Sequence, residues 1–199
     1  MLNNSPWAQS QMRGEAPPET RGRNPGSLNP QLGDPGMARV PQEIFLRVRF
    51  VSAKPIREGF ANRVLSSQTG DQADMASRLQ TAIDEGFGDF IVVAVNIDGQ
   101  NPQTVAPTFQ MLRRLNLAEI GDTAYLERRD GKRLSLIDYK TPVADDMGGK
   151  FVFPRTLDGE PFLTPESGWV RFVLNSTGNL KVNLRFDVKK MFYNGKLEY

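Results

Sequence analysis

The first 42 residues of this chain differ sharply in composition from everything that follows them. They hold half of the 14 prolines and 5 of the 18 glycines, but few large apolar side chains. Proline removes a backbone hydrogen-bond donor and interrupts helices and central strands. Such a segment has little apolar surface to bury, so burial does not offset the entropy of ordering it. We therefore predict an extended Pro/Gly-rich arm over residues 1–42 and a single globular β-rich domain over residues 43–199.

Within the arm, Trp7 is a large aromatic residue in a polar surrounding. An exposed indole contributes nothing to a free arm, whereas docking it into an apolar pocket is favourable. We interpret Pro6 and Trp7 as interaction residues, and a tryptophan exposed by chance is the alternative. About forty extended residues reach on the order of 100 Å at roughly 3.3 Å per residue, so a second copy of the chain is within range.

The pattern after residue 43 is mostly that of β-strands. Apolar and charged residues alternate over residues 44–50 and again over 180–188, which is typical of strands with one wet face. A continuous apolar run over residues 90–95 predicts a central strand buried on both faces. The pair Asp130-Gly131 stands between two β-rich runs and predicts a hairpin with a two-residue turn and a positive φ.

Two helices are expected towards the N-terminal side of this domain. One follows Pro55, which suits a first helical turn, and the other spans residues 72–85. Residues 98–107 are expected to be a loop because they carry Pro102 and Pro107, and a short helix is expected over residues 108–117. The fold class predicted is α+β, a mostly antiparallel β-sheet or sandwich with helices at one side.

The absence of histidine and cysteine excludes several kinds of chemistry. It removes Ser-His-Asp and Cys-His nucleophiles, structural zinc, haem ligation and redox thiols. No apolar run reaches the roughly 18 residues that a membrane span needs. We therefore expect a non-catalytic protein without a cofactor and without a transmembrane segment.

Carboxylates are the metal ligands and catalytic groups that remain. Asp145 and Asp146 precede Met147-Gly148-Gly149 and are weak candidates for a calcium site, although a solvated acidic turn explains them as well. A metal-dependent or carboxylate hydrolase is the alternative function, and no spacing selects its pair. The residues available to it are Asp98, Asp122, Glu127, Asp138, Asp145, Asp146, Asp158, Glu160 and Glu166.

A basic stretch near the C-terminus offers a further alternative, a polyanion-binding module. Alternation places Lys181, Arg185 and Lys189 on one strand face, with Phe192 and Tyr193 following. A solvated sheet face has the same pattern. For this reason the sequence does not favour nucleic acid as a partner.

Three segments resemble a family of uncharacterised exported bacterial proteins: residues 2–8 with Ser5-Pro6-Trp7, residues 50–58, and residues 193–199. The mature chains of this family begin with a Ser-Pro-Trp segment and a Gly/Pro-rich linker. The resemblance implies export, with a leader before Met1, and an extracellular or periplasmic location. It implies no catalytic residue, and a cytoplasmic location remains the alternative.

Together these observations favour a non-catalytic, secreted or envelope-associated structural or interaction module. Its expected partner, reached through the N-terminal arm, is a second copy of the chain or another envelope protein. Self-assembly through the arm would make it an assembly subunit.

Overall fold

The computed structural model describes residues 44–67, 72–143, 145–176 and 180–199. The chain divides after Arg39 into two units, and every described residue belongs to the second, Val40–Tyr199. Pro6 and Trp7 lie outside the described residues.

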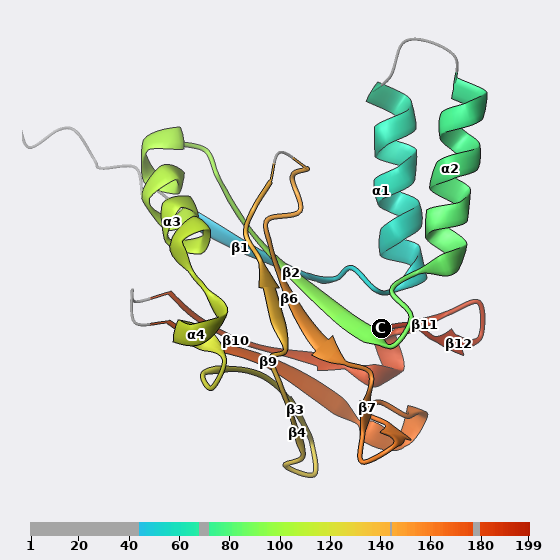
Figure 1. Cartoon of the computed structure of the whole chain (residues 1–199), viewed down its shortest axis with the longest axis vertical. Helices are drawn as coiled ribbons and strands as arrows, with labels where there is room; N and C mark the ends of the chain where they lie inside the picture. Colours follow the sequence, from blue (N-terminus) through green and yellow to red (C-terminus); the bar gives the residue numbers. More distant parts are fainter. Residues whose placement is uncertain (1–43, 68–71, 144, 177–179) are drawn as a thin grey trace, which may run out of the picture. The chain divides into compact units, whose positions relative to one another are not determined.

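Two four-stranded antiparallel sheets form the body of this unit (Figure 1). Sheet A has the order β1-β2-β6-β5, made of Ile44–Phe50, Phe90–Gly99, Gly149–Pro154 and Asp138–Lys140. Sheet B has the order β10-β9-β3-β4, made of Lys181–Asp187, Trp169–Asn175, Ala124–Arg128 and Arg133–Ser135. Two short hairpins complete the strands, β7–β8 (Thr156–Leu157, Glu160–Pro161) and β11–β12 (Phe192–Tyr193, Lys196–Leu197). The predicted α+β class with antiparallel sheets is confirmed.

The core lies between the inner faces of the two sheets. Phe151 and Phe153 of β6 contact Phe172 of β9 with ring centroids 5.2 and 6.3 Å apart. On β2, Val93 faces this core, whereas Val92 belongs to a second apolar cluster on the outer face of sheet A. Residues 91–95 are therefore buried on both faces, as predicted, whereas Phe90 at the start of the run is 46% exposed.

The described helices are α1 (Lys54–Ser67), α2 (Gln72–Glu85), α3 (Pro102–Arg114) and α4 (Leu117–Ile120). The first two stand side by side as a helical hairpin (Figure 1). Their positions confirm both helices predicted for the N-terminal side. Two 3₁₀ turns, Pro165–Ser167 and Val188–Lys190, are also present.

The expected loop over residues 98–107 is wrong. Strand β2 continues to Gly99, and α3 begins at Pro102. The side chain of Asn101 accepts a hydrogen bond from the Gln103 amide, and Pro102 occupies the first turn, where a missing N–H costs nothing. Pro107 lies inside the helix, where its missing N–H leaves only the carbonyl of Gln103 without an i→i−4 donor. Here capping outweighed the helix-breaking tendency of proline.

The hairpin at Asp130-Gly131 forms between β3 and β4, but its turn is one residue longer than predicted. The Arg128 amide donates to the Lys132 carbonyl at 2.9 Å, and the Gly131 amide donates back to the Arg128 carbonyl at 2.9 Å. Three residues, 129–131, thus connect the strands, and Gly131 alone among them has a positive φ, +84°. A type I turn followed by a left-handed glycine gives this geometry.

Candidate functional site

One side of the sandwich is incompletely covered, and we call it the open seam: Ile44, Leu46 and Val48 of β1 with Leu184 and Phe186 of β10. Strands β1 and β10 are the outer strands of their sheets, and the described residues add no strand beside either of them. At one end the two edges meet, where the rings of Phe50 and Phe186 lie 5.0 Å apart. At the opposite edges, β4 leads directly into β5, and the Ile137 amide of that connection donates to Val152 of β6.

The strand register shows that the residues of the open seam face the core. Val48 pairs with Val95, and Leu184 pairs with Phe172, both fully buried core residues. Nevertheless Ile44 is 37% exposed and Leu184 is 38% exposed. Inward-facing apolar side chains in the middle of a covered sheet are buried. The described residues therefore leave the inner face uncovered at both of these edges.

A cavity of about 250 Å³ lies at the end of the open seam. Its apolar wall comes from β1, the start of α1, β10 and the C-terminal segment, and includes Val48, Phe50, Ile56, Phe186, Met191 and Phe192. Drug-sized ligands occupy pockets of roughly 300–1,000 Å³, so this cavity takes a smaller occupant. The cavity is thus suited to a single large side chain, and Phe192 at its wall is 42% exposed.

Hydrogen bonds from α1 hold the C-terminal wall of this cavity in place. The Tyr193 hydroxyl donates to Glu58 Oε2 at 2.7 Å, and the Lys54 amide donates to Glu198 Oε2 at 3.0 Å. The hydrogen bond to the Glu58 carboxylate raises the pKa of Tyr193. The wall is therefore fixed from both sides of the β11–β12 hairpin.

Of the three basic residues predicted to share a strand face, only two do so. Lys181 and Arg185 lie on the outer face of β10. The strand ends at Asp187, whose side chain accepts a hydrogen bond from the Lys189 amide and starts a 3₁₀ turn. Lys189 is therefore not on the strand, because the capping aspartate stops the alternation one residue after Phe186.

Arg185 belongs to a transverse row that crosses all four strands of sheet B. We call it the arginine row: Arg185, Arg171, Glu127 and Arg133, each directly opposite the next. Glu127 lies 2.6 Å from Arg133 and 3.7 Å from Arg171. No acidic side chain in the described part of the chain lies within ion-pair distance of Arg185. Its guanidinium and that of Arg171 lie 5.9 and 5.0 Å from the ring of Trp169.

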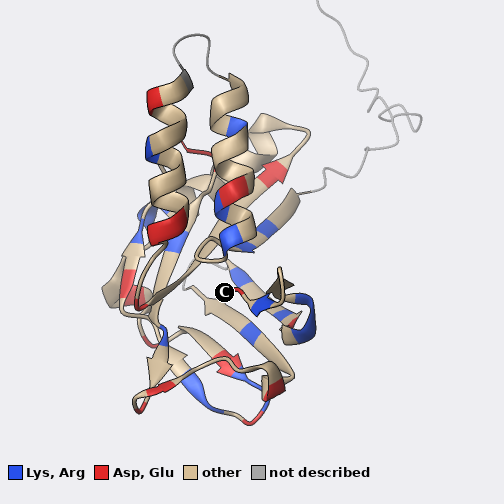
Figure 2. Ribbon diagram, turned by 90° about the vertical axis from the view of Figure 1, so that its right-hand side faces the viewer, with Lys and Arg blue, Asp and Glu red and all other residues tan. Residues whose placement is uncertain are grey.

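The sequence did not indicate this row, because strand pairing brings together residues that are far apart along the chain. The spacing of Glu127, Arg133 and Arg171 shows nothing until the register of β3, β4 and β9 is known. In the rest of the described chain, Lys and Arg are interspersed with Asp and Glu over helices and strands (Figure 2).

Five of the nine acidic candidates, Asp98, Glu127, Asp138, Asp145 and Asp146, form an ion pair with a neighbouring cation. Asp145 pairs with Lys150 at 2.6 Å, and Asp146 pairs with Arg63 at 3.7 Å. Asp98 and Asp138 are likewise paired, with Arg47 and Lys140. Within the described ranges, no three acidic side chains gather in a way that could hold a metal ion.

No family model, curated protein or solved structure matches this chain. Among the described residues, no helix is both long and apolar enough to cross a membrane.

Proposed function

We propose that this protein is a non-catalytic structural or interaction module that self-associates when the N-terminal arm of one copy docks along the open seam of another. The observation that carries this proposal is the exposure of Ile44 and Leu184, two core-facing residues on the outer strands of the two sheets. An outer strand offers unpaired backbone groups to an added strand, and the apolar residues beside it offer side-chain contacts.

The arm is the occupant that the chain itself supplies. It joins the domain at Ile44, where β1 begins, and residues 1–42 are long enough to reach a second copy. Proline is accepted in an added strand at an outer edge, provided that the proline nitrogen faces away from the partner. Trp7 is the largest apolar side chain of the arm and matches the single-side-chain size of the seam cavity.

We propose a secreted or envelope-associated location, extracellular or periplasmic, for this module. The support is the resemblance of its Ser-Pro-Trp segment and two further segments to exported bacterial proteins. Detection of the protein in the periplasmic or extracellular fraction of the cells that produce it would support this location. Recovery in the cytoplasmic fraction alone would contradict it.

Trp7→Ala in the full chain tests the docking. Burying an indole contributes about 2–3 kcal/mol, so the substitution weakens self-association on the order of a hundredfold, measured by analytical ultracentrifugation. Leu28→Ala is the matched control, an apolar truncation in the same arm outside the Ser-Pro-Trp segment. Equal association of both variants and the unaltered protein would contradict the proposal. An unaltered protein that is monomeric at every concentration would do the same.

A second candidate function, polyanion binding, rests on the arginine row. Directly opposed like charges destabilise a sheet, yet Arg171 and Arg185 face each other across β9 and β10. Stacking on Trp169 and the Glu127 carboxylate offset part of this repulsion. Arg185→Gln weakens salt-dependent binding of inorganic polyphosphate if the row binds polyanions. Arg78→Gln on α2, where Arg78 pairs with Asp74, is the control.

A further inference from the structure

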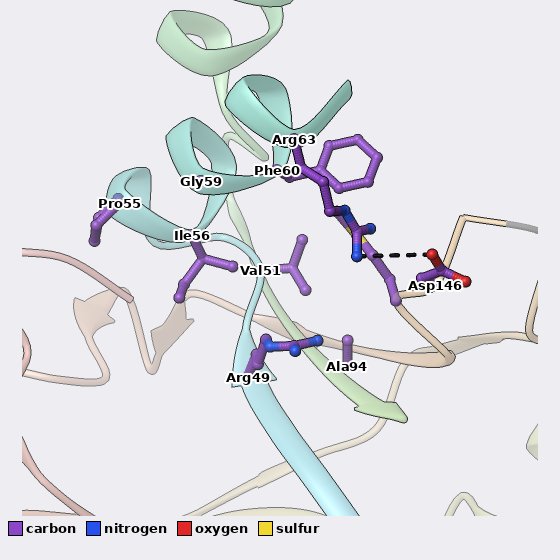
Figure 3. A pocket seen from close by; sticks show the side chains of 10 residues that line it. Arg49, Val51, Pro55, Ile56, Gly59, Phe60, Arg63, Ala94 and Asp146 are labelled. Atoms are coloured by element: carbon purple, nitrogen blue, oxygen red, sulfur yellow. Dashed lines mark ion pairs between the residues drawn. The ribbon is translucent and has the colours of Figure 1, made fainter. Parts of the chain in front are cut away.

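A second cavity, of about 260 Å³, lies between α1 and the outer face of sheet A (Figure 3). Most of its lining is apolar and includes Val51, Ile56, Phe60, Ala94 and Met147. Two guanidinium groups, those of Arg49 and Arg63, also line it. In Figure 3, Arg49 extends from β1 across the floor beside Ala94, and Arg63 reaches from α1 towards Asp146. The pocket therefore combines apolar walls with two cations.

Arg49 differs from the neighbouring arginines, because it has no polar partner among the residues that the structure describes. Arg47, two residues earlier on the same face of β1, lies 2.6 Å from Asp98. Arg63 lies 3.7 Å from Asp146 and donates to the Asp145 carbonyl at 3.1 Å. The side chain of Arg49 makes no hydrogen bond or ion pair with any part of the chain that the structure describes. Partial burial and the nearby charges of Arg47 and Arg63 lower the pKa of Arg49.

The loop that carries Asp146 and Met147 is held firmly against the strand beneath it. Gly148 has φ +86°, and a Cβ at this position would lie 2.1 Å from the Val95 carbonyl oxygen. Asn96 Nδ2 donates to the Asp146 carbonyl at 2.9 Å, and the Met147 amide donates to Asp145 Oδ1 at 3.0 Å. This rim of the pocket is therefore preformed.

We propose that this pocket binds a small apolar carboxylate, whose head group pairs with Arg49 and whose hydrocarbon body lies against Val51, Ile56 and Ala94. The planar fork of a guanidinium matches a carboxylate in two parallel hydrogen bonds. The adjacent Arg63 is a second cation, offset in part by Asp146, which lies 3.7 Å from it at the rim with a side chain 82% exposed to solvent. The cavity volume lies just below the range of pockets that hold drug-sized ligands, so the hydrocarbon chain of the carboxylate must be short.

Titration of the full chain with hexanoate, followed by NMR shifts of the Ala94 and Gly59 amides, tests this site. Hexanoate shifts both amides, whereas hexanol, its neutral counterpart, binds at least tenfold more weakly. Arg49→Gln weakens hexanoate binding about tenfold or more, because a charge-assisted hydrogen bond is lost. Arg47→Gln is the matched control and leaves binding unchanged, since Arg47 does not line the pocket.

Gly59→Leu provides a second, independent variant that fills the pocket without removing a charge. A Cβ at this helical position meets no atom within 4 Å, so the helix accepts the side chain. The variant retains its fold, as circular dichroism will show, and loses hexanoate binding. Hexanoate that shifts neither amide, or equal affinity for hexanoate and hexanol, overturns the proposal. Binding that is unchanged in either Arg49→Gln or Gly59→Leu overturns it as well.

Discussion

Replacing Leu184 by serine separates the two roles that the open seam gives to this side chain. Full burial of a leucine contributes about 1.5–3 kcal/mol. Leu184 is 38% exposed, so roughly six-tenths of that value, about 1–2 kcal/mol, already stabilises the folded domain. The remaining four-tenths, about 0.6–1.1 kcal/mol, is gained only when a docked strand covers the side chain. Leu184→Ser should therefore weaken self-association about three- to sixfold.

Two measurements on the same sample distinguish these contributions. Urea denaturation gives the loss in free energy of unfolding, and sedimentation equilibrium gives the dissociation constant of the dimer. Ile137→Ser is the control, because Ile137 is 43% exposed but lies at the opposite edge, between β4 and β5. It should lower stability without changing association. If Leu184→Ser associates as tightly as the unaltered protein while its unfolding free energy falls, the open seam is not the docking surface.

Three further predictions concern the domain itself. Tyr139→Phe removes the hydroxyl that donates to the Leu112 carbonyl at 2.6 Å, so it should lower the free energy of unfolding in urea by about 1–3 kcal/mol. Tyr125→Phe, on the solvent-facing side of sheet B, is the control and should be nearly neutral. Gly131→Ala places a Cβ at φ +84° and should cost about 1–2 kcal/mol in the same assay; no loss would contradict the left-handed turn. The Arg128 guanidinium lowers the pKa of Asp130 to about 2, below its unfolded value near 3.9. The stability from this pair is therefore present above about pH 4 and lost as pH falls towards 2, and Asp130→Asn should flatten that part of the stability–pH curve.

The elements most closely predicted from the sequence are those whose signal is local. The alternation over residues 44–50 and the apolar stripe of residues 72–85 gave the right strand and the right helix. The start of α3 was missed because proline was weighed as a helix breaker, whereas Asn101 caps a helix that begins at Pro102. Lys189 was misplaced for a similar reason, since a capping aspartate ended the strand early.

The candidate sites depend on contacts that no local pattern records. The arginine row needs the register of four strands, and the open seam needs the exposure of Ile44 and Leu184 in the folded sandwich. Arg49 could not be predicted as a site residue either, because in the sequence it is one of several charged residues on the solvent-facing side of a strand. Only the structure reveals that Arg49 lines a cavity and that none of the described residues pairs with its guanidinium.

Cysteine cross-linking between two copies tests the docking of the arm most directly, because the chain contains no cysteine of its own. One variant carries Ala8→Cys beside Trp7, and a second, with a size tag, carries Phe192→Cys at the wall of the seam cavity. A disulfide forms only when the two Cβ atoms approach to about 3.5–4.5 Å. Arm docking predicts a mixed disulfide dimer when the two variants are oxidised together. Val143→Cys in place of Phe192→Cys is the control, because Val143 is 60% exposed and does not line the seam cavity, and its yield of mixed dimer should be clearly lower. A yield no higher than that of the control would contradict docking between copies. A chain that carries both substitutions and forms its disulfide entirely within one copy would contradict it as well.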